Sequence, residues 1–195
     1  MNSKVTLFEV LNAPAAADPT VVAIAAFLAE RLIWLVPIVL AGCWLWGDRL
    51  HKRSVTAATF AGLLALLIAQ ACSLYYTPRP FAAGVGHTLL AHAADSSFPS
   101  DHATLMAAVA LSLASIRATR LQGMALAAFW FPMAWARVYL GVHFPIDMLG
   151  GLAIGTLAML CVQWWGAPFV DFAFPRVLWL YLIVFRWFIR KGWLR

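Results

Sequence analysis

Two segments of the sequence collect residues that are suited to phosphate chemistry, and both stand between long apolar runs. The residues are Arg79, Ser100, Asp101 and His102 in the first segment, and Arg137, His143 and Asp147 in the second. An arginine guanidinium offers paired donors that match phosphate oxygens, and an imidazole can serve as a nucleophile or as a general acid. These residue types predict phosphoryl chemistry at a single site.

The spacing of His143 and Asp147 predicts a histidine that is held by a carboxylate. The two residues are four positions apart, so their side chains can meet on one face of a helix, and Pro145 fits the first turn of that helix. A carboxylate bonded to one imidazole nitrogen fixes the tautomer and leaves the other nitrogen free to attack. We therefore expect His143 to be the nucleophile and His102 to be the acid that protonates the leaving oxygen.

Ser100 is expected to cap a helix at the same site. It precedes an apolar run, as N-cap serines do, and the free N–H groups at a helix N-terminus can bind an anion. Asp101 interacts favourably with the dipole of such a helix, and it could also repel or position a second phosphate. The cap and the two arginines together predict a phosphate-binding site.

The overall composition indicates a membrane protein. Of the 195 residues, 64% are hydrophobic and 11% are charged, whereas a soluble domain has roughly 45–50% apolar and about 25% charged residues. The basic residues behind the net charge of +6 lie between apolar runs rather than in one patch, which argues against nucleic-acid binding. The three cysteines lie inside apolar runs and form no CxxC pair, so we expect neither a disulfide nor a cysteine metal site.

Five apolar segments approach the length of about 20 residues that a helix needs to cross a bilayer. They are residues 23–46, 55–76, 100–116, 121–135 and 148–165. No repeat or domain boundary interrupts them. The expected fold class is therefore an all-α integral membrane protein, a bundle of five transmembrane helices that forms one domain over residues 1–195.

The distribution of basic residues predicts which end of this bundle faces the cytoplasm. Residues 48–53 and 117–120 hold most of the basic charge between the helices, whereas residues 77–99 and 136–144 hold one arginine each. The predicted site lies in the second pair of loops. It should therefore face the periplasm or the cell exterior, with the N-terminus on the same side.

The terminal segments are expected to lie on the membrane surface. The apolar run Val177–Phe185 is followed by a basic cluster, which a sixth crossing would place on the outer side against the charge rule. We therefore expect an interfacial helix on the cytoplasmic face, and a sixth span is the alternative. Val5–Leu11 is expected to be a short surface helix on the outer side.

Three motifs in these segments resemble the signature of the type 2 phosphatidic acid phosphatase superfamily. They are an Arg-Pro block at 79–80, a Pro-Ser-x-His block at 99–102 and an Arg-x5-His-x3-Asp block at 137–147. The resemblance implies a helical bundle and a phosphatase that forms a phosphohistidine and requires no metal or other cofactor. The roles that it implies are phosphate binding for Arg79, Ser100 and Arg137, nucleophile for His143, orientation of that histidine for Asp147, and general acid for His102.

Finer details of the motifs are similar to the BcrC-type undecaprenyl-diphosphate phosphatases. Pro-Ser-Asp-His replaces the usual Pro-Ser-Gly-His, and the runs 92–98 and 141–145 also match. The resemblance implies that the substrate is a polyprenyl diphosphate lipid, undecaprenyl diphosphate, which is hydrolysed to the monophosphate carrier used in peptidoglycan synthesis. It further implies a place in the bacterial inner membrane and an association with bacitracin resistance.

One position departs from the superfamily pattern. A lysine usually stands seven positions before the arginine of the first block, and Cys72 occupies that position here. A cysteine cannot bind phosphate as a cation, so another group is expected to take this part. The candidates within the same loop are His87 and His92.

Three alternatives stay open at this point. The substrate could be another lipid phosphate, such as phosphatidic acid, phosphatidylglycerol phosphate or a lipid A phosphate. The protein could instead transfer the phosphoryl group from undecaprenyl diphosphate to lipid A, or it could be a membrane transporter or scaffold without enzymatic activity. The clustering of ionisable groups on the outer side argues against a transmembrane path. The sequence does not predict the oligomeric state.

Overall fold

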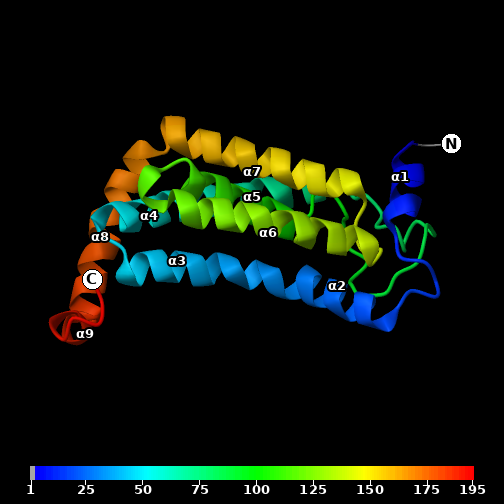
Figure 1. Cartoon of the computed structure of the whole chain (residues 1–195). Helices are drawn as coiled ribbons and strands as arrows, with labels where there is room; N and C mark the ends of the chain where they lie inside the picture. The colour runs from blue at the N-terminus through cyan, green and yellow to red at the C-terminus, as the bar shows by residue number, and fades with distance from the viewer. Residues whose placement is uncertain (1–2) are drawn as a thin grey trace.

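The computed structural model describes residues 3–195, and all of the regular structure in that part of the chain is helical (Figure 1). The longer helices are α1 (Ser3–Leu11), α2 (Pro19–Arg31), α3 (Leu35–Trp46), α4 (Arg49–Ser73), α5 (Asp101–Ala114), α6 (Arg120–Tyr139), α7 (Pro145–Trp165), α8 (Ala167–Val184) and α9 (Arg186–Arg190). Two 3₁₀ turns, Leu32–Trp34 and Arg117–Thr119, join α2 to α3 and precede α6. The predicted all-α fold class is confirmed.

Helix α5 lies in the middle of the bundle and packs against α4, α6 and α7. Small residues allow this close approach, since a side chain at Gly151 or Gly155 of α7 would collide with the backbone of α5. The indole N–H of Trp130 on α6 donates to the carbonyl oxygen of Ala103 at 3.0 Å and ties α6 to the first turn of α5. The start of α5, where the predicted acid His102 stands, is therefore held from two sides.

Local capping explains where the helices begin. Asp48 accepts hydrogen bonds from the backbone of Leu50 and His51, so α4 begins at Arg49, six residues before the predicted apolar span. Ser100 caps α5 through the N–H of Ala103 at 3.5 Å, as the sequence predicted. Because the basic residues Arg49, Lys52 and Arg53 lie in the first turns of α4, hydropathy alone did not predict where this helix begins.

Several helices have the length and apolarity of membrane spans. Four segments meet this criterion separately, namely Pro19–Trp46, Arg49–Ser73, Pro145–Trp165 and Ala167–Val184, and Asp101–Ala114 meets it together with Arg117–Tyr139 as a pair bent by 115°. Large apolar side chains such as Leu67 and Phe131 are exposed on the outside of the bundle, where lipid would surround them. The chain is a multi-span membrane protein.

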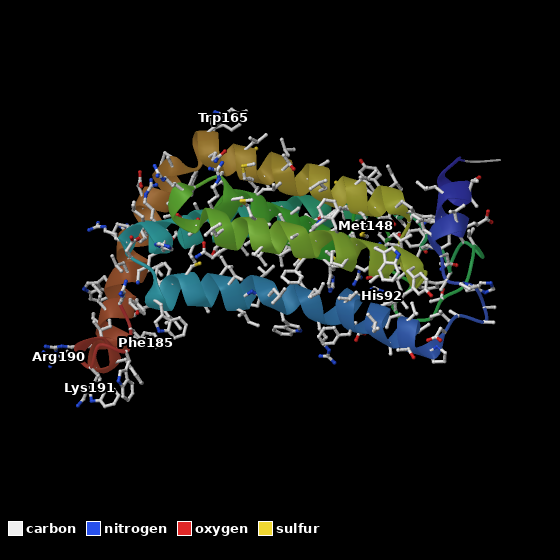
Figure 2. All side chains as sticks on the ribbon, in the orientation of Figure 1. His92, Met148, Trp165, Phe185, Arg190 and Lys191 are labelled. Carbon is white, nitrogen blue, oxygen red and sulfur yellow. The ribbon has the colours of Figure 1, made fainter. Side chains whose placement is uncertain are left out.

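The C-terminal tail differs from its prediction in length. Helix α8 begins at Ala167, immediately after α7, rather than at Val177, and Figure 1 shows it lying across one end of the bundle instead of parallel to the other helices. It is anchored by an ion pair of 2.8 Å between Asp171 and Arg53. Arg190 and Lys191 project away from the bundle beyond it (Figure 2).

The N-terminal helix covers the opposite end, as predicted for a short helix near Val5–Leu11. Phe8 is fully buried, and its ring meets the ring of Phe144 edge to face at 5.1 Å. Asn12 donates from Nδ2 to the carbonyl oxygens of His87 and Tyr139 at 2.9 and 3.0 Å and accepts from the N–H of His87 at 2.6 Å. This end of the molecule therefore holds α1 and both loops that carry the predicted site (Figure 1).

Candidate active site

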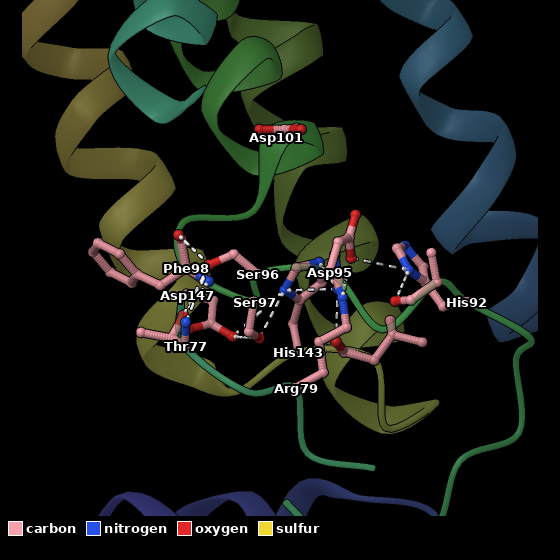
Figure 3. Close-up of polar contacts among 12 residues, drawn as sticks. Thr77, Arg79, His92, Asp95, Ser96, Ser97, Phe98, Asp101, His143 and Asp147 are labelled. Atoms are coloured by element: carbon pink, nitrogen blue, oxygen red, sulfur yellow. Dashed lines mark hydrogen bonds and ion pairs between the residues drawn. The ribbon is translucent and has the colours of Figure 1, made fainter. Parts of the chain in front are cut away.

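His143 and Asp147 form a buried pair at the N-terminus of α7 (Figure 3). Their side chains are 2% and 1% exposed, and Nδ1 of His143 lies 3.4 Å from Oδ2 of Asp147. The same Oδ2 accepts the backbone N–H of Phe144 at 2.8 Å, which fixes the carboxylate in the first turn of the helix. With Nδ1 facing this carboxylate, Nε2 is the nitrogen that faces the cavity.

Ser97 is a member of this group that the motifs did not reveal. Its hydroxyl donates to Oδ2 of Asp147 at 2.5 Å and lies 3.5 Å from Nδ1 of His143. The backbone N–H of Ser97 donates to the carbonyl oxygen of Thr77 at 2.8 Å, which holds the loop in place. Ser97 lies in an irregular loop, and no sequence spacing links it to Asp147, fifty residues further along the chain.

Two buried guanidinium groups converge on Nε2 of His143. Nη1 of Arg79 lies 3.0 Å from it and Nη2 of Arg137 lies 3.3 Å from it. Arg79 also donates from Nη1 to the carbonyl oxygen of Val142 at 2.9 Å and from Nε to the carboxylate of Asp95 at 2.8 Å. Asp95 thus compensates one of the two buried charges, and the sequence motifs did not predict it.

Arg137, unlike Arg79, forms no ion pair with a carboxylate in the described part of the chain. The side chain is 3% exposed, and Nη1 donates to the carbonyl oxygen of Ala29 at 3.1 Å. Within residues 3–195, its Nε has no hydrogen-bond partner. A buried cation without a counterion is costly. An anion bound beside Nε2 of His143 would supply the missing partner.

The surroundings of His143 keep its imidazole neutral. Burial lowers the pKa of His143 to about 4, and the nearby guanidinium groups of Arg137 and Arg79 act in the same direction, against the hydrogen bond with Asp147, which raises it. Burial also lowers the pKa of His92, with Arg79 as the next cause. At neutral pH His143 therefore carries a lone pair on Nε2, which is what a nucleophile needs.

A cavity of about 360 Å³ opens in front of this nitrogen. Its lining residues are Gln70, Ser73, Arg79, His92, Asp95, Ser96, Pro99, Asp101, His102, Arg137 and His143. The structure thus brings six of the predicted site residues to one cavity. Two more, Ser100 and Asp147, are buried beside it as a helix cap and as the partner of His143.

His87 is the predicted site residue that does not reach the cavity. Its side chain is exposed, and its backbone N–H and carbonyl oxygen both form hydrogen bonds with the side chain of Asn12. Gly141 lies beside it with a φ of +77°, and a Cβ at that position would collide with the carbonyl oxygen of His87. The segment around His87 therefore shapes the turn before His143, and the imidazole of His87 does not line the cavity.

Cys72 does not line the cavity either, although it holds the position of the usual lysine. The end of α4 instead contributes Gln70 and Ser73. Gln70 donates from Nε2 to Oδ2 of Asp101 at 3.1 Å. At this wall of the cavity, neutral polar groups and a carboxylate stand where a lysine was expected.

A metal site was not expected, and that expectation stays a prediction. In the described part of the chain, no three His, Cys, Asp or Glu side chains are grouped so that they could hold a metal ion. The cavity is lined by two guanidinium groups, three imidazoles and two carboxylates, and the carboxylate of Asp147 is buried behind His143. Such a set can bind a phosphoryl group, attack it and protonate a leaving oxygen.

Comparisons with known proteins agree with this chemistry. Residues 54–169 match the model of the PAP2 superfamily. YbjG of Escherichia coli (strain K12), provisionally named an undecaprenyl-diphosphatase, is 36% identical over 196 residues, which cover 100% of this chain and 98% of YbjG. The undecaprenyl-diphosphatase BcrC of Bacillus subtilis (strain 168) is 37% identical over 135 residues, 69% of each chain.

A solved structure shows a related fold. The crystal structure of Aquifex aeolicus LpxE superposes with a TM-score of 0.68 and covers 84% of this chain and 96% of its own, at 22% sequence identity. At that identity the likeness concerns the arrangement of the helices.

Proposed function

This chain belongs to the PAP2 superfamily, and from that premise we propose that it is an undecaprenyl-diphosphate phosphatase. As a family member it is a lipid phosphatase, and its relatives YbjG and BcrC carry the undecaprenyl-diphosphatase name. The observation that carries the proposal is the buried guanidinium of Arg137, whose Nε has no hydrogen-bond partner, beside Nε2 of His143. A diphosphate lipid would bring its terminal phosphoryl group to this point.

In the first step of the proposed reaction, the lone pair of Nε2 on His143 attacks the terminal phosphorus. An N–P bond forms while the bridging P–O bond breaks, and the bridging oxygen leaves with undecaprenyl phosphate after taking a proton from His102, which the negative charge of the bound diphosphate favours in its protonated form. Arg79 and Arg137 shift their hydrogen bonds from Nε2 to the phosphoryl oxygens as these approach. Charge stabilisation and positioning of this kind supply most of the catalysis in phosphoryl transfer.

In the second step, water attacks the same phosphorus while His102 accepts a proton from it. The N–P bond breaks, its electron pair returns to Nε2, and orthophosphate leaves. His102 thereby regains the proton that it gave up in the first step. Asp147, held by Ser97 and by the N–H of Phe144, keeps Nδ1 of His143 in the protonated tautomer throughout.

The proposed setting is the bacterial inner membrane, with one domain over residues 1–195 and the active site toward the periplasm or cell exterior. Basic residues such as Arg49, Arg53 and Arg117 stand at the end away from the site, as cytoplasmic residues do. In this setting the enzyme would return the carrier lipid to peptidoglycan synthesis. Bacitracin, which captures the same diphosphate, would compete with it.

A phosphate-release assay tests the substrate. Purified protein would receive undecaprenyl diphosphate, phosphatidic acid, phosphatidylglycerol phosphate or lipid A alone, or undecaprenyl diphosphate together with lipid A, in detergent with and without excess EDTA. We expect the highest kcat/KM for undecaprenyl diphosphate and no loss of activity in EDTA. A preference for a monophosphate lipid, or phosphate that appears on lipid A instead of in solution, would contradict the proposal.

A further inference from the structure

A second cleft adjoins the catalytic cavity on the side of α2. It has a volume of about 410 Å³ and is lined by Glu30, Arg31, Leu90, Ala91, His92, His102 and Arg137. The last three residues also line the catalytic cavity, so they form the wall that the two spaces share. Figure 3 shows His92 on this side of His143, toward the blue helix α2, and Figure 2 shows it next to that helix.

The geometry of the reaction requires a place for the second phosphoryl group of a diphosphate. In-line attack by Nε2 of His143 puts the leaving oxygen on the far side of the terminal phosphorus, where His102 would protonate it. The lipid-side phosphoryl group begins at that oxygen. It must therefore lie next to His102, either in the mouth of the catalytic cavity or in the cleft beside α2.

Charge distinguishes the two routes. The mouth of the catalytic cavity is lined by Asp101, whose carboxylate is held by Gln70, and by Asp95, which already neutralises Arg79. A second phosphate that left through this mouth would approach two carboxylates. Like charges at such distances repel each other, so this route is unfavourable for the lipid-side phosphoryl group.

The cleft beside α2 offers a cation that is free to bind it. Arg31 is exposed and, within the described residues, forms no ion pair or hydrogen bond through its side chain. Arg137, the buried cation without a carboxylate partner, forms the inner wall, and His92 lies 3.4 Å from it. Glu30 is the one carboxylate in this lining. An unpaired arginine within an apolar segment marks function by default.

We propose that Arg31 binds the lipid-side phosphoryl group of the diphosphate in this cleft, with His92 as part of its wall, and that the lipid leaves the site beside α2. The inference rests on the proposed function and adds a subsite that selects diphosphate over monophosphate headgroups. The guanidinium of Arg31 binds the substrate phosphate, and Glu30 is the one carboxylate in the lining beside it.

The test compares Arg31→Gln with the wild-type protein. The variants would be Arg31→Gln, Arg31→Lys and, as a matched control, Arg120→Gln, which removes another exposed arginine at the other end of the bundle. The readouts are kcat/KM for undecaprenyl diphosphate and the inhibition constants of inorganic diphosphate and of orthophosphate against that reaction. Thermal midpoints in detergent would show that each variant is folded.

We expect Arg31→Gln to lower kcat/KM for undecaprenyl diphosphate by about tenfold or more, which is the usual loss for one charge-assisted hydrogen bond. The inhibition constant of inorganic diphosphate should rise by a similar factor, and that of orthophosphate by much less. Arg31→Lys should retain more activity than Arg31→Gln, and Arg120→Gln should match the wild type.

Two results would overturn the inference, and they are distinguishable. If the wild-type protein hydrolyses undecaprenyl diphosphate and Arg31→Gln does so equally well, the subsite is wrong while the proposed function stands. If Arg31→Gln raises the inhibition constants of inorganic diphosphate and of orthophosphate equally, the subsite is wrong as well. If the wild-type protein releases no phosphate from undecaprenyl diphosphate, the proposed function fails and this inference fails with it.

Discussion

Ser97 donates a hydrogen bond of 2.5 Å to Oδ2 of Asp147, the same carboxylate oxygen that faces Nδ1 of His143. The carboxylate oxygen therefore has three donors around it, since the N–H of Phe144 also reaches it. A carboxylate held in this way cannot rotate away from the imidazole. The loop before α5 and the loop before α7 are thereby joined at the catalytic pair.

Substitution of Ser97 tests this arrangement. Ser97→Ala should lower kcat by about tenfold, because a hydrogen bond to a charged group contributes roughly 1.5–3 kcal/mol, while Ser97→Thr should restore part of the activity. The control is Ser115→Ala, which removes a serine hydrogen bond at the other end of the bundle. Phosphate release by folded Ser97→Ala at the wild-type rate would show that the hydroxyl does not position Asp147.

The buried neutral His143 should make the protein less stable in mild acid. Its pKa is about 4 in the folded protein and about 6.5 when unfolded. Between these two pKa values the unfolded chain therefore binds a proton at His143 that the folded chain does not bind. The contribution to stability is complete above pH 6.5 and is lost as the pH falls toward 4. His92, whose pKa burial also lowers, acts in the same direction.

Thermal unfolding in detergent measures this effect. The midpoint of the wild-type protein should fall between pH 6.5 and pH 4, and His143→Gln, which cannot take up the proton, should show a smaller fall. Equal slopes for the two proteins over this range would mean that His143 is not held in its neutral form.

The hydrogen bonds of Asn12 predict that α1 stabilises the catalytic end. Asn12→Ala removes its bonds to the backbone of His87 and Tyr139, so we expect a loss of about 1–3 kcal/mol in stability. Because Tyr139 and His87 flank the turn at Gly141, kcat should fall as well. The control is Gln122→Ala at the opposite end of the bundle. A thermal midpoint and a kcat at wild-type values would contradict this role.

The expected orientation can be checked by cysteine labelling. In a variant without the three native cysteines, Ala83→Cys, exposed in the loop at the catalytic end, should react with a membrane-impermeant maleimide on intact cells. Ser115→Cys, exposed at the other end, should react only after the membrane is opened. The reverse pattern would place the active site on the cytoplasmic side.

Much of the site could be predicted because its residues lie at fixed spacings along helices. The four-residue spacing of His143 and Asp147 and the cap at Ser100 are local features, and the structure has both of them. Ser97 and Asp95 act from an irregular loop, where no periodicity indicates which distant side chain they meet. His87 lies in the same loop, and its spacing gave no sign that its side chain points away.

The fold, too, could be predicted only in part from the sequence. Apolar runs predicted the bundle, since a membrane span requires a long helix. They did not predict that α4 begins at Arg49, because that depends on the cap at Asp48, nor that α8 begins directly after α7. The transverse position of α8 depends on its packing against α4, which includes the exposed ion pair between Arg53 and Asp171.

The central claim is that His143 carries the phosphoryl group between the two steps, and rapid trapping tests it most directly. Protein mixed with undecaprenyl diphosphate that is radiolabelled in its terminal phosphate would be stopped in alkali, where phosphohistidine survives, and the labelled residue would be identified by mass spectrometry. We predict label on His143 in the wild-type protein and none in His143→Ala, which should release no phosphate although it is folded. Label on another residue, or phosphate release by His143→Ala, would contradict the mechanism.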